Sequence, residues 1–180
     1  MVDADPQELT EEERLVAELD LLGIRYLSRQ TTYRPANVRS PQALLVDLIQ
    51  QPSARVRASV IAVLLSHPEY AEAVPGALEQ LGPPERLTLR SFYVASVLLQ
   101  QQHAHQLQPY MRAGWRWLPD LDRASIGWDL PTEGTPREKL AALGREHRQR
   151  TQEMVNWAGT YEQVARQLLR QWELESKWKQ

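Results

Sequence analysis

Prolines and turn residues divide the chain into short stretches, and within each stretch the apolar residues recur every three or four positions. This is the spacing of one face of an α-helix. The pattern is clearest after Ser40 and Pro41, because serine caps a helix and proline suits its first position. No stretch alternates apolar and polar residues over a useful length, as a half-buried strand would. The sequence therefore predicts an all-α fold, a compact bundle of six to eight helices.

Local signals place the individual helices. A capping box of Thr10 and Glu13 opens the first, Gly23 ends it, and Thr160 is expected to cap the last. The others are expected over residues 41–49, 54–66 and 85–107, as one or two short helices within 67–82, and over 137–150. Residues 1–9 are expected to be flexible, and residues 109–135, rich in tryptophan and proline, to form an ordered loop. The 180 residues suit a single domain, 1–180.

Residues 43–65, "ALLVDLIQQPSARVRASVIAVLL", resemble a hairpin of the HEAT-repeat proteins. The stretch has an apolar first helix, a proline turn and a Val-Arg pair that opens an apolar second helix. We expect Val56 to pack inside this hairpin and Arg57 to point outward. A looser copy, "VPGALEQLGPPERLTLRSFYVAS", begins at Val74 and predicts a second hairpin beside the first. This hairpin pair indicates an architecture and no activity.

Composition removes several classes of chemistry. The absence of cysteine excludes disulfides, thiolate nucleophiles and cysteine metal sites. His103 and His105 lie two residues apart on a predicted helix, so they point away from each other and are not expected to share a metal ion. The net charge of −2 gives no whole-molecule attraction to nucleic acid or to a membrane. With neither a leader-like N-terminus nor a long apolar run, the sequence leads us to expect a soluble cytoplasmic protein without cofactor or membrane partner.

The loop at 109–135 contains the most unusual mixture of side chains. Its candidate interface residues are Arg112, Trp115, Arg116, Trp117 and Trp128. Tryptophan and arginine dominate protein-binding hot spots, which favours contact with a partner protein. Two other interpretations stay open. The tryptophans can anchor the loop by burial, or the loop can form an enzyme pocket around Asp120, Asp122 and Asp129.

Arginines form a second group of candidates. Residues 1–22 contain eight carboxylates and the single Arg14, whereas residues 23–39 contain four arginines and no acid. The candidates for contact with an anion or with nucleic acid are Arg25, Arg29, Arg34, Arg145 and Arg148. Arginines among tyrosines suit single-stranded nucleic acid. The alternative is structural, because the acidic helix can offset the basic loop, and cations late in a helix favour its dipole.

Four segments carry a resemblance to a known family: "HPEYAEAVPGALEQL", "SFYVASVLLQ", "WLPDL" and "NWAGTYEQV". The first holds a His-Pro-Glu element, His67 to Glu69, followed by Ala-Val-Pro, and the last holds Asn156, Trp157 and Tyr161. Together they are similar to a family of uncharacterised bacterial helical proteins, over about residues 40–172. Some members of that family lie beside nucleotidyltransferase genes. The resemblance implies a bacterial companion protein and assigns no catalytic residue.

We therefore predict a non-catalytic protein that binds another protein, for which the resemblance suggests a nucleotidyltransferase. A nucleic-acid-binding module that uses the arginines is the first alternative. An enzyme with its pocket at the tryptophan and aspartate loop is the second. A homo-oligomer is compatible with either, and no catalytic, cofactor-binding or metal-binding residue is predicted.

Overall fold

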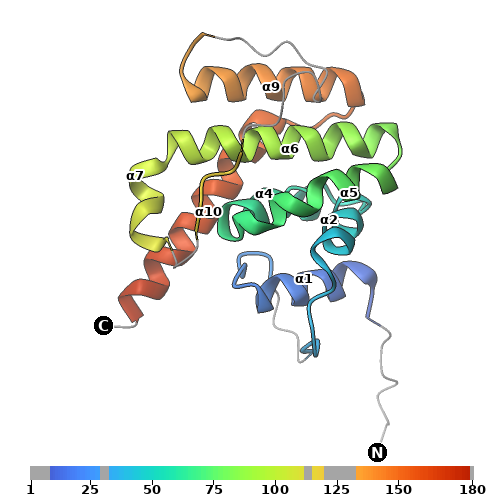
Figure 1. Cartoon of the computed structure of the whole chain (residues 1–180), viewed down its shortest axis with the longest axis vertical. Helices are drawn as coiled ribbons and strands as arrows, with labels where there is room; N and C mark the ends of the chain where they lie inside the picture. The colour runs from blue at the N-terminus through green and yellow to red at the C-terminus, as the bar shows by residue number, and fades with distance from the viewer. Residues whose placement is uncertain (1–8, 29–32, 112–114, 120–132, 179–180) are drawn as a thin grey trace, which may run out of the picture.

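The computed structural model describes residues 9–28, 33–111, 115–119 and 133–178, and every regular element in these ranges is helical (Figure 1). The elements are α1 (Glu11–Leu21), α2 (Pro41–Ile49), α3 (Ala54–Arg57), α4 (Ser59–Ser66), η1 (Pro68–Ala73), α5 (Val74–Gln80), α6 (Pro83–Gln102), α7 (Ala104–Leu107), η2 (Gln108–Tyr110), α9 (Pro136–Thr151) and α10 (Trp157–Trp178), where η marks a 3₁₀-helix. The predicted all-α bundle is confirmed.

Helix α6 forms the centre of the bundle. It crosses the middle of the molecule, with α9 on one side and α4 on the other, while α10 runs obliquely to them (Figure 1). Every residue from 91 to 100 is buried, so this helix is covered on all sides instead of along one stripe. Its buried serines remain satisfied because the hydroxyls of Ser91 and Ser96 donate to the carbonyl oxygens of Leu87 and Phe92, both at 2.7 Å.

An aromatic cluster joins α9 and α10 to this central helix. Phe92 on α6 makes edge contacts with the rings of His147, Trp157 and Tyr161 at centroid distances of 5.4 to 6.2 Å. The imidazole of His147 stacks on Trp157 at 4.3 Å. Its Nδ1 lies 2.7 Å from the Tyr161 hydroxyl and its Nε2 lies 3.3 Å from Oγ1 of Thr88. Four rings from three helices therefore pack as one unit.

His147 is held neutral in this cluster. The Thr88 hydroxyl donates to the carbonyl oxygen of Pro84, so Nε2 of His147 donates to Thr88 and Nδ1 accepts from Tyr161. Burial, assisted by the positive charge of Arg57, lowers the pKa of His147 to about 3. The basic stretch 145–150 therefore contains one residue that faces the core and carries no charge at neutral pH.

An ion network fastens α1 to α2. Arg39, just before α2, contacts Glu18 at 2.7 Å, Glu11 at 2.6 Å and Asp47 at 2.5 Å. The hydrogen bond to Glu18, which is buried, raises the pKa of Arg39 above its usual value. The structure thus places carboxylates of the acidic first helix beside the basic loop, as the structural interpretation of this charge pattern expected.

Several local predictions need correction. The helix predicted over 54–66 is interrupted at Ala58, where the Ser59 hydroxyl donates to the carbonyl oxygen of Val56. The helix predicted over 85–107 is interrupted at His103. Thr160 does not cap the last helix, because α10 already begins at Trp157, where Oδ1 of Asn156 accepts from the backbone N–H of Gly159 at 3.1 Å.

The prediction for Val56 is confirmed, and the prediction for Arg57 is wrong. Val56 is buried. Arg57 turns inward, where it contacts Glu153 and the face of the Trp157 ring. Its Nη2 donates to Glu153 at 2.7 Å, and its guanidinium lies 5.7 Å from the Trp157 ring centroid. Its partners follow it in the chain by almost one hundred residues, which no local pattern reveals.

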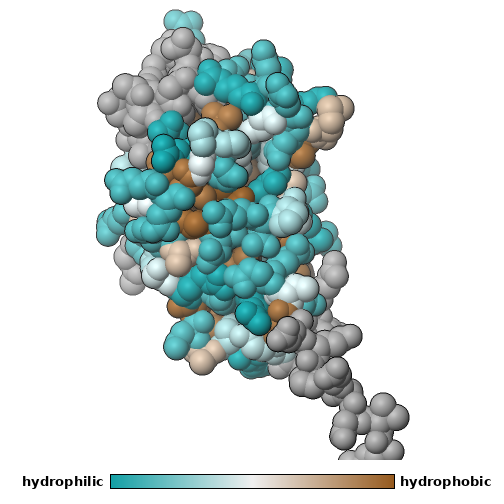
Figure 2. Space-filling view, turned by 90° about the vertical axis from the view of Figure 1, so that its right-hand side faces the viewer, coloured by the Kyte–Doolittle hydropathy of each residue, from teal (hydrophilic) through white to brown (hydrophobic). Residues whose placement is uncertain are grey.

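Two predicted segments fall largely outside the described residues. Of residues 1–9 only Leu9 is described, and of 109–135 the described part is 109–111, 115–119 and 133–135. None of the helices in the described ranges combines the length and apolar content needed to cross a membrane. The face shown in Figure 2 is covered mainly by hydrophilic side chains, with apolar side chains in small separate patches.

We expect Gly144→Ala to destabilise the fold. A Cβ at this buried position would lie 2.5 Å from the backbone nitrogen of Ala158 and 2.7 Å from its Cβ, so α9 and α10 must separate. Overpacking of this kind costs about 1–3 kcal/mol, which exceeds the helix-propensity gain of alanine. Urea denaturation measures the loss, with the exposed Gln149→Ala on the same helix as control. An unchanged midpoint for Gly144→Ala would contradict the close approach.

The neutral state of His147 predicts a pH dependence of stability. Between about pH 6.5 and pH 3 the unfolded chain binds a proton at this histidine and the folded protein does not. The free energy of unfolding therefore falls as the pH falls through this window, by about 1.4 kcal/mol per pH unit. Urea denaturation of the wild type and of His147→Gln across this window isolates the contribution, because the variant keeps all carboxylates. If the free energy of unfolding changed with pH in the same way in both proteins, His147 would not be the source of the pH dependence.

Candidate functional site

The described tryptophan segment, residues 115–119, is irregular but firmly attached. The indole Nε1 of Trp115 donates to the carbonyl oxygen of Leu65, at the end of α4, at 3.1 Å. The backbone N–H of Leu118 donates to Oε1 of the buried Gln100 at 2.9 Å. The Tyr93 hydroxyl donates to the carbonyl oxygen of Pro119 at 2.6 Å. Two helices therefore fix the position of a segment that has no secondary structure of its own.

The two described tryptophans of this segment have different surroundings. Trp115 is half-buried, whereas Trp117 exposes 51% of its surface. Their rings meet edge to face at a centroid distance of 5.1 Å, so the inner ring supports the outer one. Arg116 between them pairs with Glu72 of η1 at 2.5 Å. The sequence grouped these three residues as candidate interface residues, and the structure distinguishes the anchor, Trp115, from the exposed Trp117.

A small hollow adjoins the anchoring tryptophan. It has a volume of about 170 Å³, and Trp115, Tyr110 and Trp172 are among its lining residues. The rings of Tyr110 and Trp172 lie 5.6 Å apart. This hollow places further aromatic surface beside the segment that presents Trp117.

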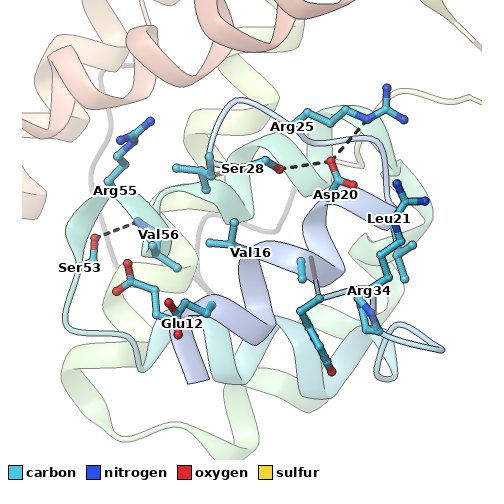
Figure 3. Close-up of a pocket in the computed structure, with 15 residues that line it drawn as sticks. Glu12, Val16, Asp20, Leu21, Arg25, Ser28, Arg34, Ser53, Arg55 and Val56 are labelled. Carbon is cyan, nitrogen blue, oxygen red and sulfur yellow. Dashed lines mark hydrogen bonds and ion pairs between the residues drawn. The ribbon is translucent and has the colours of Figure 1, made fainter. Parts of the chain in front are cut away.

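A larger cavity, of about 430 Å³, lies between α1, the loop that follows it and α3 (Figure 3). Two of the predicted anion contacts, Arg25 and Arg34, line it, together with Arg55. Three carboxylates line it as well: Glu12, Glu13 and Asp20. Val16 of α1 and Val56 of α3 contribute apolar surface. The cavity thus offers an apolar wall with charges of both signs, which does not select an anion.

Arg25 is neutralised within the protein. Its Nε lies 3.5 Å from Asp20, and its Nη1 lies 3.1 Å from Glu175 near the end of α10. The side chain of Gln171 holds the same turn through the backbone N–H of Arg25 at 2.8 Å and the carbonyl oxygen of Gly23 at 2.7 Å. This arginine therefore attaches the loop to α10.

The predicted arginine set does not form one surface. Arg145 and Arg148 lie on α9, at the opposite end of the molecule from α1 and the loop that contains Arg25 and Arg34 (Figure 1). Both line a shallow depression with Met154. The remaining predicted site residues, Arg29, Arg112, Asp120, Asp122, Trp128 and Asp129, lie outside the described residues.

The residues that carry the family resemblance have structural roles. Nε2 of His67 donates to the carbonyl oxygen of Leu22 at 2.8 Å and so ties the end of α4 to the end of α1. Trp157 and Tyr161 belong to the aromatic cluster. These positions report how the helices are held together and do not locate a site.

No pattern in the sequence marks the side chains that hold the tryptophan segment. Gln100 and Tyr93 lie within an apolar stretch of α6, and their partners become visible only when the segment crosses this helix. Among the described residues, no group of three or more His, Asp or Glu side chains is arranged to hold a metal ion.

Comparison with known proteins assigns the chain to no family. No protein-family model matches the chain, and no curated protein or solved structure was found to match it.

We expect Gln100→Leu to release the tryptophan segment. The substitution leaves the backbone N–H of Leu118 buried without its acceptor, which costs about 1–3 kcal/mol. Amide hydrogen exchange at Leu118 should accelerate, because its N–H loses this bond. The exposed neighbour Gln101→Leu is the matched control and should leave that rate unchanged. Equal exchange rates in both variants would show that Gln100 does not hold the segment.

Proposed function

We propose that this protein is a non-catalytic, cytoplasmic interaction module that binds another protein through the surface around Trp117. The observation that carries the proposal is a half-exposed tryptophan on a segment that α4 and α6 hold in place. Exposed large aromatic rings that are already positioned favour binding, because little conformational entropy remains to be lost on association.

The neighbours of Trp117 support a protein as its partner. Arg116 lies beside it at the surface and, although paired with Glu72, keeps donors for a partner. The hollow beside Trp115 can accept an apolar side chain. An exposed ring, an adjacent arginine and a nearby hollow are the components of an interaction hot spot.

The sequence resemblance makes a nucleotidyltransferase the first partner class to test. The alternative of a nucleic-acid-binding module receives less support from the geometry, because Arg25 is paired with acids and Arg145 and Arg148 lie at the far end of the bundle. The enzyme alternative depends on aspartates that lie outside the described residues.

Substitution of single tryptophans tests the proposal. We expect Trp117→Ala to weaken partner binding by about 30-fold or more, as a hot-spot residue would, while thermal stability stays unchanged. Trp115→Ala should instead lower the free energy of unfolding by about 2 kcal/mol, because it removes a half-buried ring and its hydrogen bond. The measurements are thermal melting and co-purification of tagged protein from the native host, with the bound protein identified by mass spectrometry.

Trp178→Ala provides the matched control, since this tryptophan is also exposed, at 88%, but lies at the end of α10. It should retain the partner. Retention of the partner by Trp117→Ala, or its equal loss from Trp178→Ala, would contradict the proposed surface.

A further inference from the structure

An open groove of about 830 Å³ runs between α3 and the first half of α10. Its lining residues are Tyr26, Ala54, Arg55, Ala58, Asn156, Gly159, Thr160, Gln163, Val164, Arg166 and Gln167. It is larger than the cavity of Figure 3 and lies at the start of α4, whereas Trp115 contacts the end of that helix. None of the candidate site residues predicted from the sequence lines it.

The charged side chains that line this groove in the described part of the chain are both arginines. Arg55 and Arg166 line it, and no described carboxylate does. Nη2 of Arg55 donates to the carbonyl oxygen of Tyr26 at 3.1 Å, a neutral acceptor, and Arg55 also borders the cavity of Figure 3 with its carboxylates. Within the described ranges neither arginine forms an ion pair, whereas nearby Arg25 and Arg57 are both paired with glutamate. In a chain of net charge −2, two exposed and unpaired arginines in one groove mark a local preference for an anion.

The shape of the groove suits an extended chain. Asn156, just before α10, and Thr160, Gln163 and Gln167 on this helix follow one another at helical spacing, so they line one side of the groove over about 16 Å. Small residues, Ala54 and Ala58, lie on the opposite wall of the groove. A distance of about 16 Å accommodates about five residues of extended peptide.

The polar groups also match a peptide. The amides of Gln163 and Gln167 have no hydrogen-bond partner in the part of the chain that the structure describes, and each can both donate and accept. A peptide backbone presents the same two kinds of group. Tyr26 contributes the single aromatic ring among the lining residues, and its hydroxyl is buried, so the groove offers no row of rings on which bases could stack.

We propose that the groove between α3 and α10 binds an extended acidic segment of a protein, with carboxylates at Arg55 and Arg166 and backbone amides at Gln163 and Gln167. This binding site is separate from the Trp117 surface and does not depend on it.

Fluorescence anisotropy of a labelled oligoglutamate peptide with the full-length protein tests this proposal. We expect binding that weakens as salt is raised, because the contacts are charged. Arg55→Gln and Arg166→Gln should each weaken it by about tenfold, the effect of losing one charge-assisted hydrogen bond. Arg170→Gln, an exposed arginine on α10 outside the groove, is the matched control and should bind as the wild type does.

Two further probes discriminate the ligand class. A labelled oligoglutamine peptide should bind much more weakly than oligoglutamate, and a single-stranded oligonucleotide should not compete. Absence of oligoglutamate binding, equal affinity in all three arginine variants, or tighter binding of the oligonucleotide would each overturn the proposal. Thermal melting of the variants confirms that these exposed substitutions leave the fold intact.

Discussion

The packing around Phe92 determines how the helices of this protein are arranged. This residue is the single phenylalanine of the chain, and its ring is completely buried. Its ring contacts His147 on α9 and both Trp157 and Tyr161 on α10. One side chain of the central helix therefore sets the positions of two other helices. Edge-to-face contacts between rings depend on orientation as well as distance, which gives this cluster more geometric specificity than an aliphatic core. The neutral His147 satisfies its polar atoms inside the cluster.

The position of α10 determines what the rest of the molecule can present. One side of this helix packs on the aromatic cluster, and the side chains of its first half that face α3 line the groove with the unpaired arginines. Its second half reaches the turn after α1, where Gln171 and Glu175 hold Gly23 and Arg25. Helix α6 positions the other surface, because Gln100 and Tyr93 fix the segment that carries Trp117. Both proposed binding surfaces therefore depend on helices that pack on the same core.

Predictions from the sequence succeeded where the signal is local. The capping box at Thr10 and the cap at Ser40 lie where their side chains can bond to backbone three residues later, and α1 and α2 begin there. They failed where a distant partner decides. Arg57, for example, turns toward Glu153, which lies 96 residues later in the chain. The start of α10 was missed for a local reason, because Oδ1 of Asn156 accepts from the N–H of Gly159 and caps this helix ahead of Thr160. For the candidate site, the sequence pointed to the tryptophan segment but could not distinguish Trp115 from Trp117, because their burial depends on α4 and α6.

The sequence by itself determined the helical class and most helix boundaries, because capping, proline placement and apolar spacing act between residues within about one turn of each other. Tertiary structure alone decided which ionisable and aromatic groups are buried, paired or exposed. His147 became neutral, Arg57 turned inward and Arg55 has no ion-pair partner among the described residues, because each outcome depends on desolvation and on charges supplied by other helices. Desolvation and interactions with charges on other helices arise only when segments far apart in the chain are brought together.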